Sequence, residues 1–273
     1  MNEFNINIIG YGFVGKAVGN LMIKNKVNFN VYDILDGTSL DTIIKFEKDN
    51  SLNVYFICVP TPPMVSGDCD ISVVESVIND LSKLVTKESV VVIKSTIKPG
   101  TTKKLSEKFK NIQVVFCPEF LREISANEDM YNTNFALCGT VCKEIEETLV
   151  HLFKNVLYMH NPNFKCYIKT PEECELFKYT VNTFLAVKVW YFNEIHCLCE
   201  KMNIDYQEFK TLFPLDPRIG EYGTTVPNNG NFGFSGSCLP KEIRAMTQVQ
   251  RDLDIPNSVL QEIIKRNNIF LEK

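Results

Sequence analysis

Short apolar runs alternate with helix-like stretches through the first 120 residues of the chain. Residues 72–85 place valine, isoleucine and leucine at spacings of three and four, which is typical of an amphipathic helix, and residues 14–24 also have a helical pattern. The apolar runs that predict strands are 5–9, 29–32, 54–59, 90–93 and 113–117. Strands and helices that alternate in this way predict a Rossmann-type, doubly wound α/β fold, in which helices cover a parallel sheet.

The pattern becomes mainly helical near residue 170. Thr170, followed by Pro171 and Glu173, predicts a helix start with a threonine cap, a proline in the first turn and a glutamate that closes a capping box. No glycine or proline follows before about residue 202, so at 1.5 Å per residue this helix would be about 45–50 Å long. A helix of that length either bridges domains or packs across a subunit interface.

Three further helices are expected in this half, starting near Asp205, starting after Pro240 and covering 256–273. A glycine- and proline-rich loop, 214–236, separates the first two of them. We therefore predict two domains, a sheet-based one over 1–170 and a mostly helical one over 171–273 that is built on the long helix.

Composition narrows the class of protein. The chain of 273 residues is 45% hydrophobic and 23% charged, which is typical of a globular protein, and its net charge of −4 gives no basic face for nucleic acid or an anionic membrane. The polar first residues predict no secretory signal, and no apolar run approaches the roughly 20 residues that span a bilayer. Neither the ten scattered cysteines nor the three histidines have metal-ligand spacing, so we expect reduced thiols, no metal and a cytoplasmic location.

A glycine-rich turn, Gly10-Tyr11-Gly12-Phe13-Val14-Gly15, directly follows the first strand and opens the first helix. Gly10 permits the tight turn, Gly12 lets the backbone approach a pyrophosphate at the helix N-terminus, and Gly15 lets helix and strand pack closely. Asp33 follows 18 residues after Gly15, where a carboxylate binds ribose hydroxyls and repels a 2′-phosphate. This favours NAD over NADP; an ordinary glycine turn and a strand-end acid are the alternative.

A second glycine-rich stretch, 231–241, leads into a cysteine. Cys238 precedes a helix whose first residue is expected to be Pro240, and the helix N-terminus together with Lys241 would stabilise a thiolate there. This indicates an accessible nucleophile, while a small buried thiol in a turn is the equally open alternative.

Further candidates follow predicted strands or share a helix face. Lys178 and Asn182 lie four residues apart on the long helix, so they share one face and suit an oxyanion, unless they are ordinary solvated side chains. Glu119 and Glu123 follow the strand that ends at residue 117, and each is either a general base or a loop acid. Hydroxyl groups near a cofactor are expected from two threonines that also follow strands, Thr61 and Thr96.

Together these segments resemble the nucleotide-sugar 6-dehydrogenases, which act on UDP-glucose, GDP-mannose and UDP-N-acetylmannosamine. The matching segments occur in family order and cover most of the chain: GYGFVG, CVPTPP, GDCDISVVES, KSTIKPGTT, CPEFLREISA, ELFKYTVNTFLAVKVWYFNE, DPRIG and GFSGSCLPKE. The resemblance implies an NAD-dependent four-electron oxidation of a sugar C6 alcohol to a carboxylate. UDP-glucose and its product UDP-glucuronate are the favoured pair, with GDP-mannose and UDP-N-acetylmannosamine as alternatives.

By position in the family pattern, Cys238 would attack the intermediate aldehyde to form a thiohemiacetal, and a later thioester would be hydrolysed by water. Lys178 and Asn182 would hold the C6 oxygen, and Thr96, Glu119 and Glu123 would orient or activate water. The residues implied at the NAD site are Gly10, Gly12, Phe13, Val14, Gly15, Asp33, Val59, Pro60, Thr61, Ser95, Thr96, Glu123 and Lys241. Those implied at the sugar nucleotide are Glu119, Phe120, Leu121, Arg122, Glu123, Lys178, Asn182, Arg218, Asn231, Phe232 and Gly233.

The resemblance also implies a homodimer through the long helix, in which Arg218 reaches a substrate in the neighbouring subunit. The chain departs from the family in three respects. Ser66 stands where an aspartate is usual, at a peripheral position. Glu242 stands where an aspartate is usual, which puts acid assistance near Cys238 in question. Similar enzymes carry a third, C-terminal domain that closes over the nucleotide, so we expect the groups that would grip the uridine to be absent or supplied by a partner.

Two other functions remain open. A two-electron dehydrogenase of the hydroxyacid type shares the NAD domain and the helical second half, but it needs no thiol, so Cys238 argues against it. A non-catalytic nucleotide-binding remnant is the other alternative, and the retained candidate catalytic residues argue against decay.

Overall fold

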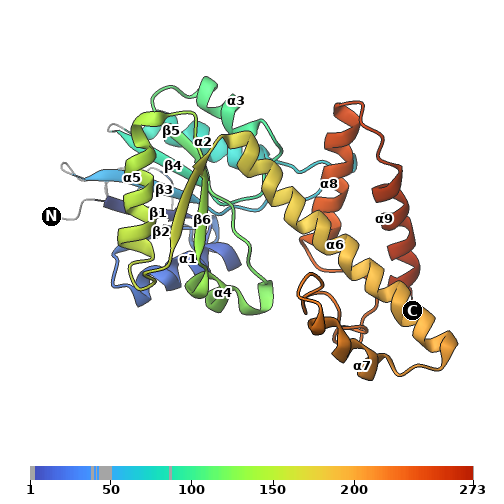
Figure 1. The fold of residues 1–273 in the computed structure, drawn as a ribbon. Coiled ribbons are helices and arrows are strands. Elements are labelled where there is room, and N and C mark those ends of the chain that lie inside the picture. Colours follow the sequence, from blue (N-terminus) through green and yellow to red (C-terminus); the bar gives the residue numbers. More distant parts are fainter. Residues whose placement is uncertain (1–3, 38–39, 41, 43–50, 86–87, 273) are drawn as a thin grey trace. The chain divides into compact units, whose positions relative to one another are not determined.

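A seven-stranded sheet organises the amino-terminal part of the computed structural model, which describes residues 4–37, 40, 42, 51–85 and 88–272 (Figure 1). Its strands are β1 (Phe4–Ile9), β2 (Phe29–Tyr32), β3 (Leu52–Ile57), β4 (Ser89–Ile93), β5 (Gln113–Phe116), β6 (Phe135–Gly139) and β7 (Lys165–Lys169). The strand order is β2-β1-β3-β4-β5-β6-β7. The first five strands pair in parallel, whereas β6 runs antiparallel to β5 and parallel to β7.

Helices cover both faces of this sheet (Figure 1). One face carries α1 (Phe13–Lys24), α4 (Ala126–Asn132) and α5 (Glu146–His151), the last continued by a π-helical segment, Leu152–Leu157. The other face carries α2 (Ser72–Leu84) and α3 (Thr101–Lys108). Successive strand residues face opposite layers, so Val92 packs in the first cluster and Ile93 in the second. The predicted doubly wound α/β fold is confirmed.

The predicted strands agree with the observed ones to within two residues. The strand predicted over 54–59 extends two residues too far, since β3 ends at Ile57. Pro60, which follows soon after, has no N–H group to donate to a neighbouring strand. The hydrophobic pattern of the chain does not predict α3, α4, α5, β6 or β7. Each of these is at most eight residues long, so its apolar periodicity is short.

The long helix α6 (Pro171–Met202) begins as predicted. The Thr170 N–H donates to Glu173 Oε2 at 2.9 Å, and the Glu173 N–H donates back to the Thr170 hydroxyl at 3.3 Å. This reciprocal pair is a capping box, so local chemistry alone sets where the helix starts.

The chain divides into two compact units. The first unit contains Met1–Pro62 and Asp70–Lys178, and the second unit contains Pro63–Cys69 and Tyr179–Lys273. In the second unit, the later part of α6 packs with α8 (Leu239–Asp252) and α9 (Ser258–Leu271) around Phe234, Ile243 and Ile263. The short α7 (Tyr206–Phe209) and a 3-10 helix, Lys210–Leu215, precede an irregular loop that leads to α8.

The first residue of α8 is Leu239, so the predicted first residue, Pro240, stands in second place. Proline is tolerated there because the first N–H groups of a helix have no partner within the helix. Cys238 is consequently the N-cap residue of α8. None of the helices in the described part of the chain is both long and apolar enough to cross a bilayer.

Candidate active site

At the carboxyl ends of neighbouring parallel strands, the first residues that follow one strand donate backbone hydrogen bonds to the last residue of the next. The N–H of Cys58 donates to Ile9 O at 2.7 Å, and that of Cys117 donates to Ile93 O at 2.9 Å. Equivalent bonds join Gly10 to Tyr32 at 2.8 Å and Lys94 to Ile57 at 2.9 Å. The residues that follow these strands therefore lie along one edge of the sheet, where ligands of such folds bind. They include the predicted positions 10–15, Asp33, Val59, Pro60, Thr61, Ser95, Thr96 and Glu119.

The glycine turn at this edge is shaped by its neighbours. Gly10 has φ of 87°, and a Cβ there would lie 2.9 Å from the carbonyl carbon of Cys58. A Cβ on Gly15 would collide with the carbonyl oxygen of Gly10, so the start of α1 packs directly on the turn. A Cβ on Gly12 would meet no atom within 4 Å, and no side chain caps α1. The helix N-terminus is therefore open to a phosphate, and these residues fit NAD.

Asp33 is tied to the same turn. Its Oδ2 accepts a hydrogen bond of 2.5 Å from Tyr11 N, and its Oδ1 accepts one of 2.9 Å from Leu35 N. The structure thus brings the predicted ribose-binding acid beside the predicted pyrophosphate turn, although 22 residues separate Asp33 from Tyr11.

The hydroxyl groups at the neighbouring strand ends are held in place. Ser95 Oγ donates to Val59 O at 2.6 Å, which joins the segments that follow β4 and β3. Thr61 and Thr96 are buried, whereas Pro60 is exposed.

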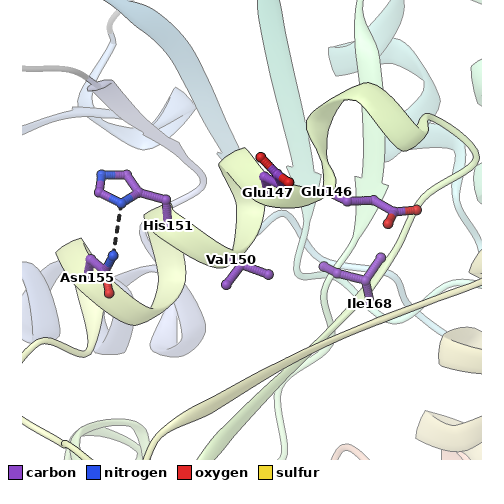
Figure 2. Close-up of a pocket in the computed structure, with 6 residues that line it drawn as sticks. All are labelled: Glu146, Glu147, Val150, His151, Asn155 and Ile168. Atoms are coloured by element: carbon purple, nitrogen blue, oxygen red, sulfur yellow. Dashed lines mark hydrogen bonds between the residues drawn. The ribbon is translucent and has the colours of Figure 1, made fainter.

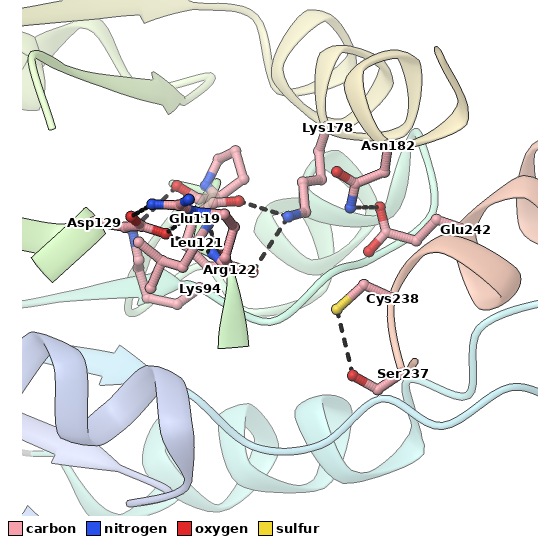
Figure 3. A network of polar contacts seen from close by, with 11 residues as sticks. Lys94, Glu119, Leu121, Arg122, Asp129, Lys178, Asn182, Ser237, Cys238 and Glu242 are labelled. Atoms are coloured by element: carbon pink, nitrogen blue, oxygen red, sulfur yellow. Dashed lines mark hydrogen bonds and ion pairs between the residues drawn. The ribbon is translucent and has the colours of Figure 1, made fainter. Parts of the chain in front are cut away.

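Two buried lysines hold the segment that follows β5. Lys178 Nζ donates to Glu119 O at 2.6 Å and lies 3.2 Å from Glu119 Oε1 (Figure 3). Lys94 Nζ donates to the preceding carbonyl, Pro118 O, at 3.2 Å and lies 3.6 Å from Cys117 Sγ. Burial opposes ionisation of Cys117, but hydrogen bonds from Cys138 and Lys94 and the Lys94 charge outweigh it and lower the Cys117 pKa. The predicted Lys178 is therefore paired with the predicted Glu119 rather than solvated on a helix surface.

The residues after Glu119 form a second polar group. Leu121 N donates to Glu119 Oε2 at 2.6 Å. Arg122 binds Asp129 through Nε at 3.0 Å and a terminal nitrogen at 2.6 Å (Figure 3). Glu123 is exposed, and Phe120 packs edge-on against Phe177 of α6.

Cys238 lies half-buried at the start of α8 in the second unit. Its Sγ is 3.5 Å from Ser237 Oγ (Figure 3). Its carbonyl accepts the N–H of Glu242 at 2.9 Å. Glu242 is 1% exposed, and its Oε2 accepts a hydrogen bond of 2.8 Å from Asn182 Nδ2. The structure therefore links three predicted residues of this unit, Cys238, Glu242 and Asn182. Lys241 is half-buried on α8.

Apart from Asn182 on α6, the predicted sugar-nucleotide residues of the second unit lie in the irregular loop before α8. Asn228 and Asn231 exchange two backbone hydrogen bonds of 2.8 and 3.0 Å, so they close a tight turn. Phe232 is half-buried, and Gly233 is buried with φ of 71°. Arg218 is bound bidentately to Asp216, with its side chain 89% exposed.

Comparison with known proteins places the chain in a family. Residues 34–157 match the NAD-binding domain of the UDP-glucose/GDP-mannose dehydrogenase family, and residues 172–269 match its central domain. The UDP-glucose 6-dehydrogenases of Rickettsia bellii and Rickettsia prowazekii are 31% and 30% identical to the chain, over 96% and 97% of its length. This chain belongs to the UDP-glucose/GDP-mannose dehydrogenase family.

The fold of this family member agrees with solved structures. The UDP-glucose dehydrogenase of Pyrobaculum islandicum superposes with a TM-score of 0.81 at 24% identity, covering 98% of the chain and 68% of its own length. The chain spans 66% and 67% of the length of the two Rickettsia relatives, or about two thirds. The match to the family's NAD-binding domain confirms the predicted cofactor, NAD.

A shallow pocket of this dehydrogenase-family chain lies apart from the strand ends. It has a volume of about 380 Å³ and is lined by Glu146, Glu147, Val150, His151, Asn155 and Ile168 (Figure 2). It contains none of the predicted site residues. Within the described part of the chain, no group of three or more metal-ligating side chains could hold a metal ion.

Some polar residues around the predicted site were not singled out from the sequence. Lys94 adjoins the predicted Ser95, Asn193 contacts the backbone of Gly233, and Asn267 contacts that of Phe234. Lys94 directly follows a strand, so the rule that selected Thr96 could also have selected it. No sequence signal distinguishes Asn193 and Asn267 from solvated helical asparagines.

Proposed function

We propose that the chain carries the NAD-dependent oxidation of a nucleotide sugar at C6, from the alcohol to the carboxylate, with UDP-glucose as substrate and UDP-glucuronate as product. The observation that carries the proposal is the position of Cys238 as the N-cap of α8, half-buried and one helical turn from a buried carboxylate–amide pair. An anionic sulfur or oxygen at this point faces the positive end of the helix dipole.

Two other cysteines, Cys58 and Cys174, are poor nucleophiles at neutral pH. Burial raises the pKa of Cys58, at the sheet edge, to about 12, and it raises that of Cys174 on α6 to about 12 as well. At neutral pH these groups are protonated thiols, and a thiol is a weaker nucleophile than a thiolate. A cysteine nucleophile needs a reduced sulfur, so the expected cytoplasmic location accompanies this proposal.

The reaction consumes one alcohol, one water and two NAD, and it yields one carboxylate, two NADH and three protons. The glycine turn and Asp33 would hold NAD at the sheet edge, and two NAD molecules, bound in turn, would supply one hydride acceptor each. Lys178 and Asn182 would donate hydrogen bonds to the C6 oxygen and stabilise its negative charge. The Cys238 sulfur would add to the aldehyde carbon and later leave from a thioester as water forms the new C–O bond.

Glu119 suits the proton transfers in these steps. Its carboxylate is held by Lys178 and by Leu121 N, so its position is defined, and it is 8% exposed. A general base must be held within hydrogen-bond reach of the proton that it takes. Thr96 and Glu123 would assist in holding the water.

One experiment separates this proposal from its alternatives. The purified chain is incubated with NAD and UDP-glucose, GDP-mannose or UDP-N-acetylmannosamine, and NADH formed per sugar consumed is counted. Two NADH per sugar support the proposal, and the sugar that reacts fastest identifies the substrate. One NADH per sugar indicates a simple two-electron dehydrogenase. No NADH, with NAD still bound, indicates a non-catalytic nucleotide-binding protein.

We further propose a homodimer through α6. Phe184, Tyr191 and Leu198 repeat every seven residues, and 61%, 51% and 55% of their respective surfaces are exposed. A seven-residue apolar repeat forms a seam that packs against another helix. Tyr191→Glu should convert the dimer to a monomer in sedimentation velocity, whereas a native chain that sediments as a monomer at micromolar concentration would contradict the proposal.

A further inference from the structure

Two buried asparagines of the second unit have no part in the function proposed above. Asn193 lies on α6 and Asn267 on α9, and each is 2% exposed. Burying a side-chain amide costs free energy unless its donor and acceptor are both paired. Three of the four hydrogen bonds of these two amides go to the irregular loop that precedes Cys238.

Asn267 pairs with the backbone of a single loop residue. Its Oδ1 accepts the N–H of Phe234 at 2.7 Å, and its Nδ2 donates to Phe234 O at 2.9 Å. Asn193 Oδ1 accepts the N–H of the preceding residue, Gly233, at 2.9 Å, and Asn193 Nδ2 donates to Val189 O at 2.8 Å. Amides from two helices therefore hold two successive residues of the loop.

Packing supports these hydrogen bonds on both sides. The Phe234 side chain is 3% exposed in the cluster that contains Ile243 and Ile263. The Phe232 ring lies 5.3 Å from the His196 ring in a separate cluster. Gly233 between them has φ of 71°, and a Cβ there would lie 2.6 Å from Asn267 Oδ1. Only a glycine fits this position without displacing the amide.

The loop needs such anchors because it has little regular structure of its own. Gly220, Gly223, Gly230 and Gly236 all have positive φ, in addition to Gly233. Glycine-rich backbone loses the most conformational entropy on ordering, so a single loop conformation requires compensating contacts. The two amides supply three hydrogen bonds at the point where the candidate segment 231–233 meets the helical core.

We propose that Asn193 and Asn267 are positioning residues that fix segment 231–233 in the conformation that receives the sugar nucleotide. This inference rests on the proposed function, because only that function assigns a ligand to the segment. The asparagines themselves touch no substrate; they act through the backbone of Gly233 and Phe234.

The first test needs no ligand. We compare hydrogen exchange in Asn267→Ala and in Asn268→Ala, a matched control because Asn268 is the adjacent, exposed asparagine of the same helix. Loss of the buried bonds should speed exchange at Gly233 and Phe234 by at least about tenfold in Asn267→Ala, with α6 and α8 unaffected. Unchanged exchange at these two amides, or faster exchange throughout the second unit, would overturn the positioning role.

The second test measures affinity for UDP-glucose and for NAD by calorimetry. Asn267→Ala should raise the Kd for UDP-glucose about tenfold and leave that for NAD within about twofold, while Asn268→Ala changes neither. Asn193→Ala removes one loop bond instead of two, so it should give a smaller increase and serves if Asn267→Ala does not fold. Equal UDP-glucose affinity in all variants would contradict the inference.

The two proposals fail in distinguishable ways. A native chain that binds no sugar nucleotide contradicts the proposed function, and the exchange measurement then decides alone whether the asparagines order the loop. A native chain that binds UDP-glucose, together with variants that bind it equally well, contradicts only the positioning role.

Discussion

The carboxylate of Glu242 on α8 accepts a hydrogen bond of 2.8 Å from the side-chain amide of Asn182 on α6, and both side chains are buried. Glu242→Ala should therefore lower the free energy of unfolding by about 1–3 kcal/mol, because it removes a partner from a buried donor. Urea unfolding measures this change. Glu262→Ala removes an exposed carboxylate that pairs with Arg266, and it should cost no more than about 1 kcal/mol. If both variants lowered the free energy of unfolding equally, the Glu242 contact would not stabilise the second unit.

Two substitutions in the glycine turn should affect different properties, one the affinity for NAD and the other the stability of the chain. Gly12→Ala meets no atom within 4 Å, so it should leave the free energy of unfolding unchanged within about 0.5 kcal/mol while weakening NAD binding at least about tenfold. Gly15→Ala drives a methyl group into the Gly10 carbonyl and should cost about 1–3 kcal/mol of stability. NAD titration and urea unfolding of both variants check this. Normal NAD affinity in Gly12→Ala would exclude the turn as the pyrophosphate site.

The buried Lys178–Glu119 pair should be sensitive to removal of one charge. Lys178→Met leaves the Glu119 carboxylate buried without this cation. It should lower the free energy of unfolding by about 3–5 kcal/mol. Adding Glu119→Gln should restore part of this loss, because no uncompensated charge then remains. The exposed pair of Lys83 and Asp80 provides the control, since Lys83→Met should change stability by at most about 1 kcal/mol. A double variant that is less stable than Lys178→Met would contradict this account.

Glu175 on α6 should make stability depend on pH. Its carboxylate is buried against the start of α3, where it accepts hydrogen bonds from Gly100 N at 2.5 Å, Thr102 N at 2.8 Å and the Thr102 hydroxyl at 2.6 Å. Burial, opposed by these hydrogen bonds, raises the Glu175 pKa from 4.5 to about 7. A group whose pKa is higher in the folded state contributes stability below the unfolded pKa and loses it as pH rises through the folded pKa.

Between pH 4.5 and 8, the free energy of unfolding of the native chain should therefore fall by roughly 3 kcal/mol relative to that of Glu175→Gln, which carries no titrating group at this position. Urea unfolding at several pH values measures the difference in slope. Glu147→Gln, which changes an exposed carboxylate, should follow the native profile. Parallel profiles for the native chain and Glu175→Gln would show that this carboxyl does not titrate in that range.

Cys238→Ala should abolish acid formation while NAD binding persists, because no sulfur remains to form the thioester. Acid release is measured by chromatography and NAD binding by titration. Cys142→Ala is the control: it removes another half-buried thiol, whose pKa is raised by burial and by the neighbouring Glu144, and should leave acid formation unchanged. Undiminished acid output from Cys238→Ala would remove this thiol from the mechanism.

The parts of the molecule that could be predicted are those that neighbouring residues determine. The capping box of Thr170 and Glu173 spans four residues, and its hydrogen bonds form wherever a helix begins there. The glycine turn and the strand before it are equally local. Spacing on a helix face and the end of a strand marked Lys178 and Glu119 as candidates, and family resemblance chose between their alternative roles. Their pairing depends on contact between residues 59 positions apart.

Helix α9 shows where such inference stops. Asn267 and Asn268 are the same residue type in adjacent positions, and neither lies in a recognisable motif. Successive helical residues point about 100° apart, so folding buries Asn267 against Phe234 and leaves Asn268 exposed. Local sequence determines that a helix forms here, but the loop residue that meets it lies 33 positions away, and only the packed chain assigns one asparagine to the loop and the other to water.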